Sequence, residues 1–479
     1  MFSEKLLVLL STFSKYDLNR FRKFLLSPYF NEQEDLIRLF DLCNNALRKG
    51  GGSPERLEKS KIWTALYPER KNLDDAHLRR MASDLTQLSM RFLAMETRKK
   101  DPLKELIEIQ QALQKPELKR HLSAVEQSFY KTAAQQNVPS GLYYLDTFQF
   151  HWNIFNRASK VVSMADFMQK LLATDLELDR LYIVHKLKIY ISWLIFSGFR
   201  STDDEMVIIT GFWDYLTHAQ FKDEPLIRIY LDIVDALKNL EEEQYYRELM
   251  RNLEKYGDSI SKDDLRECYY FAQNYCAFKV NQGKIEYYRE VFEIFRRIIQ
   301  MGLLLEENQV SEGVYKNIIT ASLGVGEFKW AENFIRDYSG YLPPAIRENA
   351  MSYNLSYLYF NQKEYSRVIE LLRDVEYSDV SYALSAKVLL LRTYYELGEM
   401  IALDSLIDSF RIYLRRNKVI SKRLKRESNN FLNFLKRLAV LEDKKITGTS
   451  ALKKRIMENP SIVSKKWLLE KVDEMENRH

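Results

Sequence analysis

Apolar residues recur at intervals of three and four positions along most of the 479-residue chain, the spacing that places side chains on one face of an α-helix. The clearest stretch runs from Asp74 to about Arg98 and carries Leu78, Met81, Leu85, Leu88, Phe92 and Met95. Near the start, Ser14 and Asp17 have the spacing of a capping box, which opens a helix that ends before Pro28. These patterns predict an all-α fold.

A turn followed by apolar residues three positions apart occurs three times in the second half of the chain. The copies begin at Gly326, Lys363 and Gly398, so they are spaced by 37 and 35 residues, within the range of helix-pair units. A single unit of this kind cannot bury its apolar faces, so neighbouring units must stack into an array. The spacing therefore predicts an α-solenoid with an extended concave surface.

The first copy also carries a recognisable order of residues, namely Leu323-Gly324, Phe328, Ala331, Phe334 and Pro343. This order resembles the tetratricopeptide repeat, whose units place Leu-Gly, an aromatic residue, Ala, an aromatic residue and Pro in the same sequence. The unit that ends at Gly398 with Tyr394-Tyr395-Glu396-Leu397 resembles it as well. The resemblance implies tetratricopeptide-like helix pairs over residues 265–442.

The breaks in the pattern predict four parts. Residues 1–100 form an N-terminal helical unit, because Asp101-Pro102 tends to leave the helix, and residues 101–264 follow as a region of irregular helix pairs. The repeats occupy 265–442. A polar hinge then leads into a C-terminal capping helix within 443–479, which Ser464 can begin and whose Trp467 is expected to pack on the last helix pair.

Composition supports helices joined by short loops in a soluble protein. Gly and Pro number only 15 and 10, whereas ordinary usage would give roughly 34 and 24. The most membrane-like stretch, Ile189 to Phe199, has 11 residues, but a membrane-spanning helix needs about 20. Three cysteines with no CxxC spacing predict no disulfide framework and are typical of the cytoplasm.

Signatures of catalysis and cofactor binding do not occur in the sequence. It contains no phosphate-binding loop, dinucleotide fingerprint, HExxH or paired CxxC. Its histidines are isolated, and the acidic pairs Asp203-Asp204 and Asp263-Asp264 lie where helices are expected to begin, so they complement the helix dipole. We therefore expect no enzymatic activity, no catalytic or metal-binding residues and no cofactor.

A basic segment, residues 411–426, is the strongest local charge signal in a chain whose net charge is only +5. Lys436 and Arg437 extend it. Eight of its sixteen residues are basic and none is acidic, a pattern that neutralises phosphates or acidic protein surfaces, although solvated helices without a ligand also show it. The eight are Arg411, Arg415, Arg416, Lys418, Lys422, Arg423, Lys425 and Arg426.

Tyrosines of the repeat region are the second candidate. Tyr353, Tyr357, Tyr394 and Tyr395 could line a concave groove for a peptide, or could fill the space between helices, which is the commoner role of aromatic residues at helical spacing. The sequence as a whole predicts a non-enzymatic, cytoplasmic scaffold or adaptor that binds a protein or peptide partner on a solenoid surface. The alternative is an RNA- or DNA-associated factor that uses the basic segment 411–426.

Overall fold

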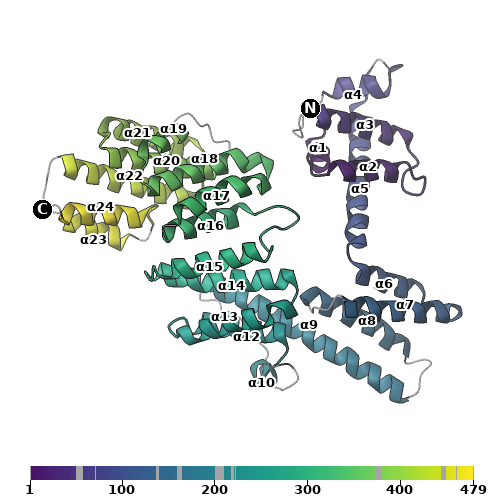
Figure 1. Ribbon diagram of the computed structural model, residues 1–479. Helices are drawn as coiled ribbons and strands as arrows, with labels where there is room; N and C mark the ends of the chain where they lie inside the picture. The colour runs from purple at the N-terminus through teal and green to yellow at the C-terminus, as the bar shows by residue number, and fades with distance from the viewer. Residues whose placement is uncertain are drawn as a thin grey trace. The chain divides into compact units, whose positions relative to one another are not determined.

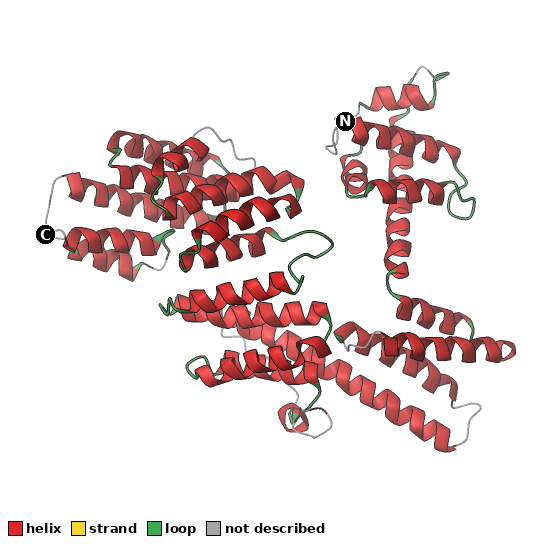
Figure 2. Ribbon diagram, viewed as in Figure 1, coloured by secondary structure: helices red, strands yellow, loops and turns green. Residues whose placement is uncertain are grey.

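A computed structural model describes most of the chain and shows only helices there (Figures 1 and 2). The described residues are 2–49, 58–70, 72–135, 140–158, 164–199, 210–216, 221, 223–372, 380–443, 449–459 and 461–477. They form α-helices joined by turns and a few short 3₁₀ helices, and they include no β-strand beyond one isolated bridge between Glu306 and Gln309. The predicted all-α class is confirmed.

The chain divides into two compact units, Met1–Tyr182 and Ile183–His479, with the division inside one long helix. The division into four parts that the sequence suggests stays a prediction. The helices up to and including that long helix are α1 (Glu4–Ser11), α2 (Lys15–Leu25), α3 (Glu34–Lys49), α4 (Lys59–Leu66), α5 (Asp75–Lys99), α6 (Pro102–Ala112), α7 (Lys119–Gln135), α8 (Gly141–Ala158) and α9 (Met164–Phe199).

The first unit contains two separate apolar cores. One joins α1 to α5 around Phe21, whose fully buried ring contacts those of Phe13, Phe40 and Phe92. The other joins α6, α7 and α8 and includes the stacked rings of Phe129 and Phe150. The predicted capping box is present, because Ser14 accepts a hydrogen bond from the Asp17 amide and the Asp17 carboxylate accepts one from the Ser14 amide.

The second unit is a succession of helices in which each one from α12 to α24 packs against the next. Contacts also join second neighbours, as between α16 and α18 and between α18 and α20. The helices are α10 (Phe212–Leu216), α12 (Pro225–Lys238), α13 (Glu243–Tyr256), α14 (Lys262–Asn281), α15 (Tyr287–Gln300), α16 (Glu312–Gly324), α17 (Phe328–Tyr338), α18 (Pro344–Asn361), α19 (Tyr365–Leu372), α20 (Val380–Leu397), α21 (Met400–Arg416), α22 (Lys422–Asp443), α23 (Ser450–Glu458) and α24 (Lys465–Asn477).

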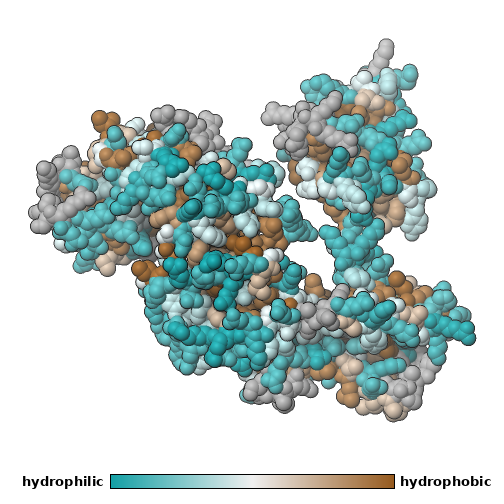
Figure 3. Space-filling model, in the orientation of Figure 1, coloured by the Kyte–Doolittle hydropathy of each residue, from teal (hydrophilic) through white to brown (hydrophobic). Residues whose placement is uncertain are grey.

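The surface of the protein is mainly hydrophilic, as expected if most apolar residues lie between the helices. On the face drawn in Figure 3 most side chains are hydrophilic, and apolar ones appear as separate patches. None of the described helices combines the length and the apolar character that a membrane crossing requires.

The three repeat copies share one backbone turn. Gly326, Lys363 and Gly398 all have positive φ angles, of 79°, 62° and 74°. After each of them, an amide donates to the carbonyl five residues earlier, as Glu327 does to Ser322 over 2.9 Å. The amide of the positive-φ residue itself donates a second hydrogen bond, to the carbonyl three residues earlier. These two hydrogen bonds define a Schellman motif, in which a helix ends at a residue in the left-handed conformation. The same turn ends α14 at Gly283 and α15 at Gly302, so the three copies share a helix end that recurs along this unit.

In one of the three copies, the positive-φ position is held by Lys363 instead of glycine, so a side chain lies in a strained conformation. The substitution Lys363→Gly is therefore expected to stabilise the protein by about 1 kcal/mol. Glycine meets no steric penalty at positive φ, although the freedom that it adds to the unfolded chain offsets part of the gain. Urea unfolding followed by circular dichroism measures the change. The reverse substitution, Gly398→Lys, should destabilise by a similar amount, and a destabilising Lys363→Gly would contradict the argument.

Candidate interaction surface

The basic segment bends around the end of one helix and the start of the next. Arg411, Arg415 and Arg416 lie in the last turns of α21, Lys418 lies in the connection, and the other four cations lie in the first turns of α22. Buried apolar residues, among them Leu414 and Ile420, anchor the segment to the fold. Most of the cationic side chains consequently face solvent, with Arg411 and Lys425 half-buried.

Only some of these cations have partners. Arg411 donates to Asn433 Oδ1 over 2.9 Å and Arg423 to Glu427 Oε1 over 2.8 Å, while Arg426 donates to Ser461 Oγ over 3.1 Å. Five cations form neither an ion pair nor a side-chain hydrogen bond with any described residue, namely Arg415, Arg416, Lys418, Lys422 and Lys425. Because the start of α22 already carries the positive end of the helix dipole, the potential there favours anions.

A groove lies beside this segment, between α22 and α23. It consists of two adjoining hollows of about 370 and 460 Å³ that share Lys436, Arg437 and Arg455. We call the two together the α22–α23 groove. The first hollow is completed by Val440, Leu441, Ala451 and Leu452, and the second by Arg411, Asn430, Asn433, Phe434 and Asn459.

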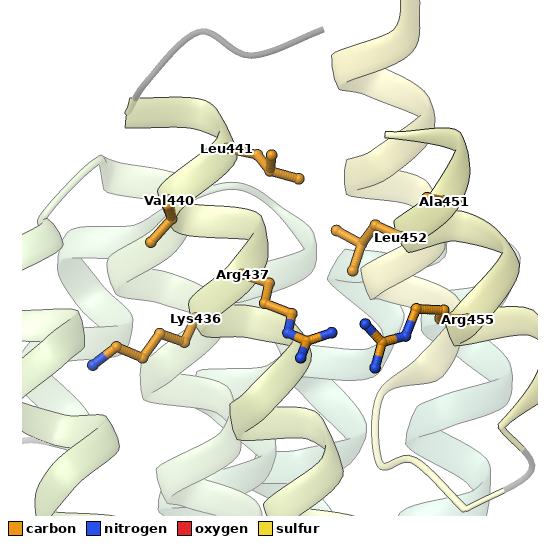
Figure 4. A pocket seen from close by; sticks show the side chains of 7 residues that line it. All are labelled: Lys436, Arg437, Val440, Leu441, Ala451, Leu452 and Arg455. Carbon is orange, nitrogen blue, oxygen red and sulfur yellow. The ribbon is translucent and has the colours of Figure 1, made fainter. Parts of the chain in front are cut away.

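Two arginines dominate the electrostatics of the groove. Figure 4 shows the guanidinium groups of Arg437, on α22, and Arg455, on α23, pointing toward each other across the gap between the helices. Neither forms an ion pair with a described residue, and no acidic side chain of the described chain lines either hollow. Lys436 forms a weak ion pair, because its Nζ lies 3.8 Å from Asp404 Oδ1, close to the largest distance at which an ion pair is counted. Among the residues that the structure describes, the groove therefore gathers positive charge without a counter-charge of its own.

The other end of the groove is apolar. Leu452 is buried and Val440 is half-exposed, and together with Leu441 and Ala451 they form an aliphatic wall next to the two arginines. A ligand that fits both ends must combine negative charge with an apolar group. Carboxylates suit the charged end, because a guanidinium group can donate two parallel hydrogen bonds to one carboxylate.

The predicted tyrosines are distributed between helix interfaces and a second hollow. Tyr353 and Tyr357 lie one turn apart on α18 with ring centroids 6.3 Å apart, and burial raises the pKa of Tyr353 to about 12. On α20, Tyr394 is half-buried, whereas Tyr395 is buried with its ring 5.4 Å from that of Trp467. Tyr357 lines a hollow of about 360 Å³ that is separate from the α22–α23 groove.

Some functional candidates could be read from the sequence and others could not. Arg437 already appears there as an extension of the basic segment. Arg455 does not, because nothing in the sequence shows that α23 returns beside α22. The acidic pair Asp203-Asp204 lies outside the described residues, whereas Asp263 and Asp264 occupy the first turn of α14 as expected. The described part of the chain holds no group of side chains suited to a metal ion.

Comparison with known proteins found no relative of this chain. No protein-family model, no curated protein and no solved structure matches the chain.

Proposed function

We propose that this protein is a non-enzymatic cytoplasmic scaffold whose α22–α23 groove binds an acidic segment of a partner protein. The packing of each helix from α12 to α24 on the next, with a shared Schellman turn at the repeat starts, supports a tetratricopeptide-like solenoid as the framework. A framework of this kind is ordered before its partner arrives, so little conformational entropy is lost on binding.

The observation that carries the proposal is the approach of Arg437 and Arg455 without an intervening acid. Both side chains are exposed, so solvent weakens the repulsion between the two like charges without cancelling it. An anion placed between them removes the repulsion and gains charge-assisted hydrogen bonds from both guanidinium groups. The groove thus offers two cations to an anionic group, and none of its described lining residues is acidic.

The aliphatic wall favours a peptide over a nucleic acid in this groove. Proteins that bind single-stranded nucleic acids usually offer aromatic rings on which bases stack, but the hollow in Figure 4 is walled by Val440, Leu441, Ala451 and Leu452. An acidic peptide can place a carboxylate on the arginines and a Leu or Ile side chain against this wall. Phe434, which lines the neighbouring hollow, is buried in the fold.

A peptide-display selection on the full-length protein tests the proposal. The wild type should enrich peptides that combine two or more carboxylates with an aliphatic residue, and the double variant Arg437→Glu/Arg455→Glu should bind them about tenfold or more weakly. Arg80→Glu is the matched control, because Arg80 is an exposed arginine of α5 that forms no ion pair with a described residue. Equal binding by wild type and double variant would refute the assignment of the groove.

The second candidate function is binding of RNA or DNA by the basic segment 411–426, and the five cations without partners favour it. It predicts that a labelled single-stranded RNA binds the wild type with an affinity that falls steeply with salt. Charge reversal at Arg415, Arg416, Lys422 and Arg423 should abolish this binding, whereas Arg437→Glu/Arg455→Glu should largely preserve it. Fluorescence anisotropy at several salt concentrations separates the two functions.

A further inference from the structure

The hollow that Tyr357 lines is built by helices that are far apart in the sequence. It encloses about 360 Å³, enough for a small organic ligand or the end of a peptide. The start of α15, the ends of α16 and α18, the second half of α20 and the start of α24 all contribute. The residues that line it are Ile285, Tyr288, Thr320, Leu323, Gly324, Tyr357, Asn361, Arg392, Ser464, Lys466, Trp467 and Glu470.

Arg392 is the unusual member of this hollow. Its guanidinium carbon lies 4.2 Å from the centroid of the Phe360 ring and 5.3 Å from that of Trp467, so two aromatic rings hold the group in place. Its Nε atom is buried and has no hydrogen-bond partner within the described structure. Arg392 forms no ion pair with any described residue, and its burial lowers the pKa of the guanidinium.

The acidic side chains nearby already have partners of their own. Glu396 accepts a hydrogen bond of 2.8 Å from the indole of Trp467 and lies 2.9 Å from Lys471 Nζ. Glu470, exposed at the rim, lies 3.9 Å from Lys466. Arg392 is therefore a half-buried cation with a buried, unpartnered Nε and no ion pair to a described residue, an arrangement that an anionic ligand would stabilise.

We propose that this hollow binds a carboxylate group through Arg392, with the rings of Tyr357 and Trp467 as walls for the body of the ligand. The planar fork of a guanidinium group matches a carboxylate. A doubly charged phosphate fits less well, because Glu470 also lines the hollow. The two possible sources of the carboxylate are a small organic acid and the C-terminus of a peptide. The site shares no residue with the α22–α23 groove and does not depend on it.

Thermal unfolding of the full-length protein tests this inference. The probes are succinate, citrate, inorganic phosphate, and a short peptide with either a free or an amidated C-terminus. At least one carboxylate probe is expected to raise the Tm of the wild type by several degrees, with no such shift in Arg392→Met. Arg392→Met alone, without any probe, should keep the Tm of the ligand-free wild type or raise it, because methionine removes the unpaired charge and keeps the apolar contacts.

The outcomes are distinguishable. A shift with succinate or citrate identifies a small acid as the ligand class, and a shift only with the free peptide C-terminus identifies a peptide. Arg392→Lys should weaken either shift, since lysine keeps the charge but lacks the fork. The inference is overturned if no carboxylate probe shifts the wild type, if phosphate alone does so, or if Arg392→Met shows the same shift.

Discussion

Lys188→Met is expected to lower the free energy of unfolding of the unit Ile183–His479 by about 3–5 kcal/mol, because it strands a buried carboxylate. Lys188 Nζ lies 2.7 Å from Asp264 Oδ1 and 2.6 Å from Glu267 Oε2, and the Asp264 side chain is only 5% exposed. Burial by itself would lower the pKa of Lys188, but hydrogen bonds to the two carboxylates raise it, so the ammonium group stays charged. The hydroxyls of Tyr230 and Ser261 also donate hydrogen bonds to Asp264, but they are neutral and cannot replace the charge of the ammonium group.

Urea unfolding followed by circular dichroism measures this effect, and the chain offers a close control. Lys186, two residues earlier on α9, is half-buried and forms no ion pair with a described residue, so Lys186→Met should change stability by less than about 0.5 kcal/mol. Adding Asp264→Asn to Lys188→Met should recover part of the loss, since it removes the stranded charge. If Lys188→Met were as mild as Lys186→Met, the ion pair would not be stabilising the unit.

Local features of the fold follow from the sequence because their causes are local. Apolar spacing of three and four residues predicts a helix from Asp74, and the structure has α5 with Asp74 as its N-cap. The turns at Gly326 and Gly398 are predictable for the same reason, since glycine adopts positive φ without steric cost. The sequence predicts that Trp467 packs on the last helix pair, and its ring lies 5.4 Å from that of Tyr395 on α20 and 6.3 Å from that of Phe431 on α22.

Contacts between distant residues do not follow from such patterns. Lys188 and Asp264 are 76 positions apart, and the periodicity of α9 gives no sign that Lys188 turns inward to an acid. From the sequence, Asp264 is expected only as a favourable charge at the start of α14, where it does lie. Its burial and its ion pair depend on how α9, α12 and α14 pack, and no local rule specifies that packing.

The candidate sites show the same limit. Charge density along the chain reveals the basic segment 411–426, because its residues are consecutive. The α22–α23 groove needs Arg455 from a different helix, and the carboxylate site needs Arg392, a single arginine within an apolar stretch of α20. The sequence does not show whether an isolated arginine in a helix is buried or whether an acidic residue lies beside it. Only the packed structure shows both.

Phe21→Ala is expected to destabilise the N-terminal helices by about 3–5 kcal/mol, the usual cost of removing a fully buried phenyl ring. The ring centroid of Phe21 lies 5.2 Å from that of Phe40 on α3 and 5.3 Å from that of Phe92 on α5, so the substitution opens a cavity where three helices meet. Hydrogen exchange measured by mass spectrometry should show reduced protection in α1 to α5. Phe21→Leu, which keeps most of the apolar volume, should cost clearly less.

The same measurement tests whether residues 1–100 form a domain of their own. The core of α1 to α5 consists only of residues between Phe2 and Phe92, with Met95 packed at its edge, and the core of α6 to α8 begins at Leu103. Because these two cores share no residue, α6 to α8 should keep their protection in Phe21→Ala while α1 to α5 lose theirs. If all eight helices lost protection together, the contact between α5 and α6 would couple the two cores, and the predicted boundary near residue 100 would be wrong.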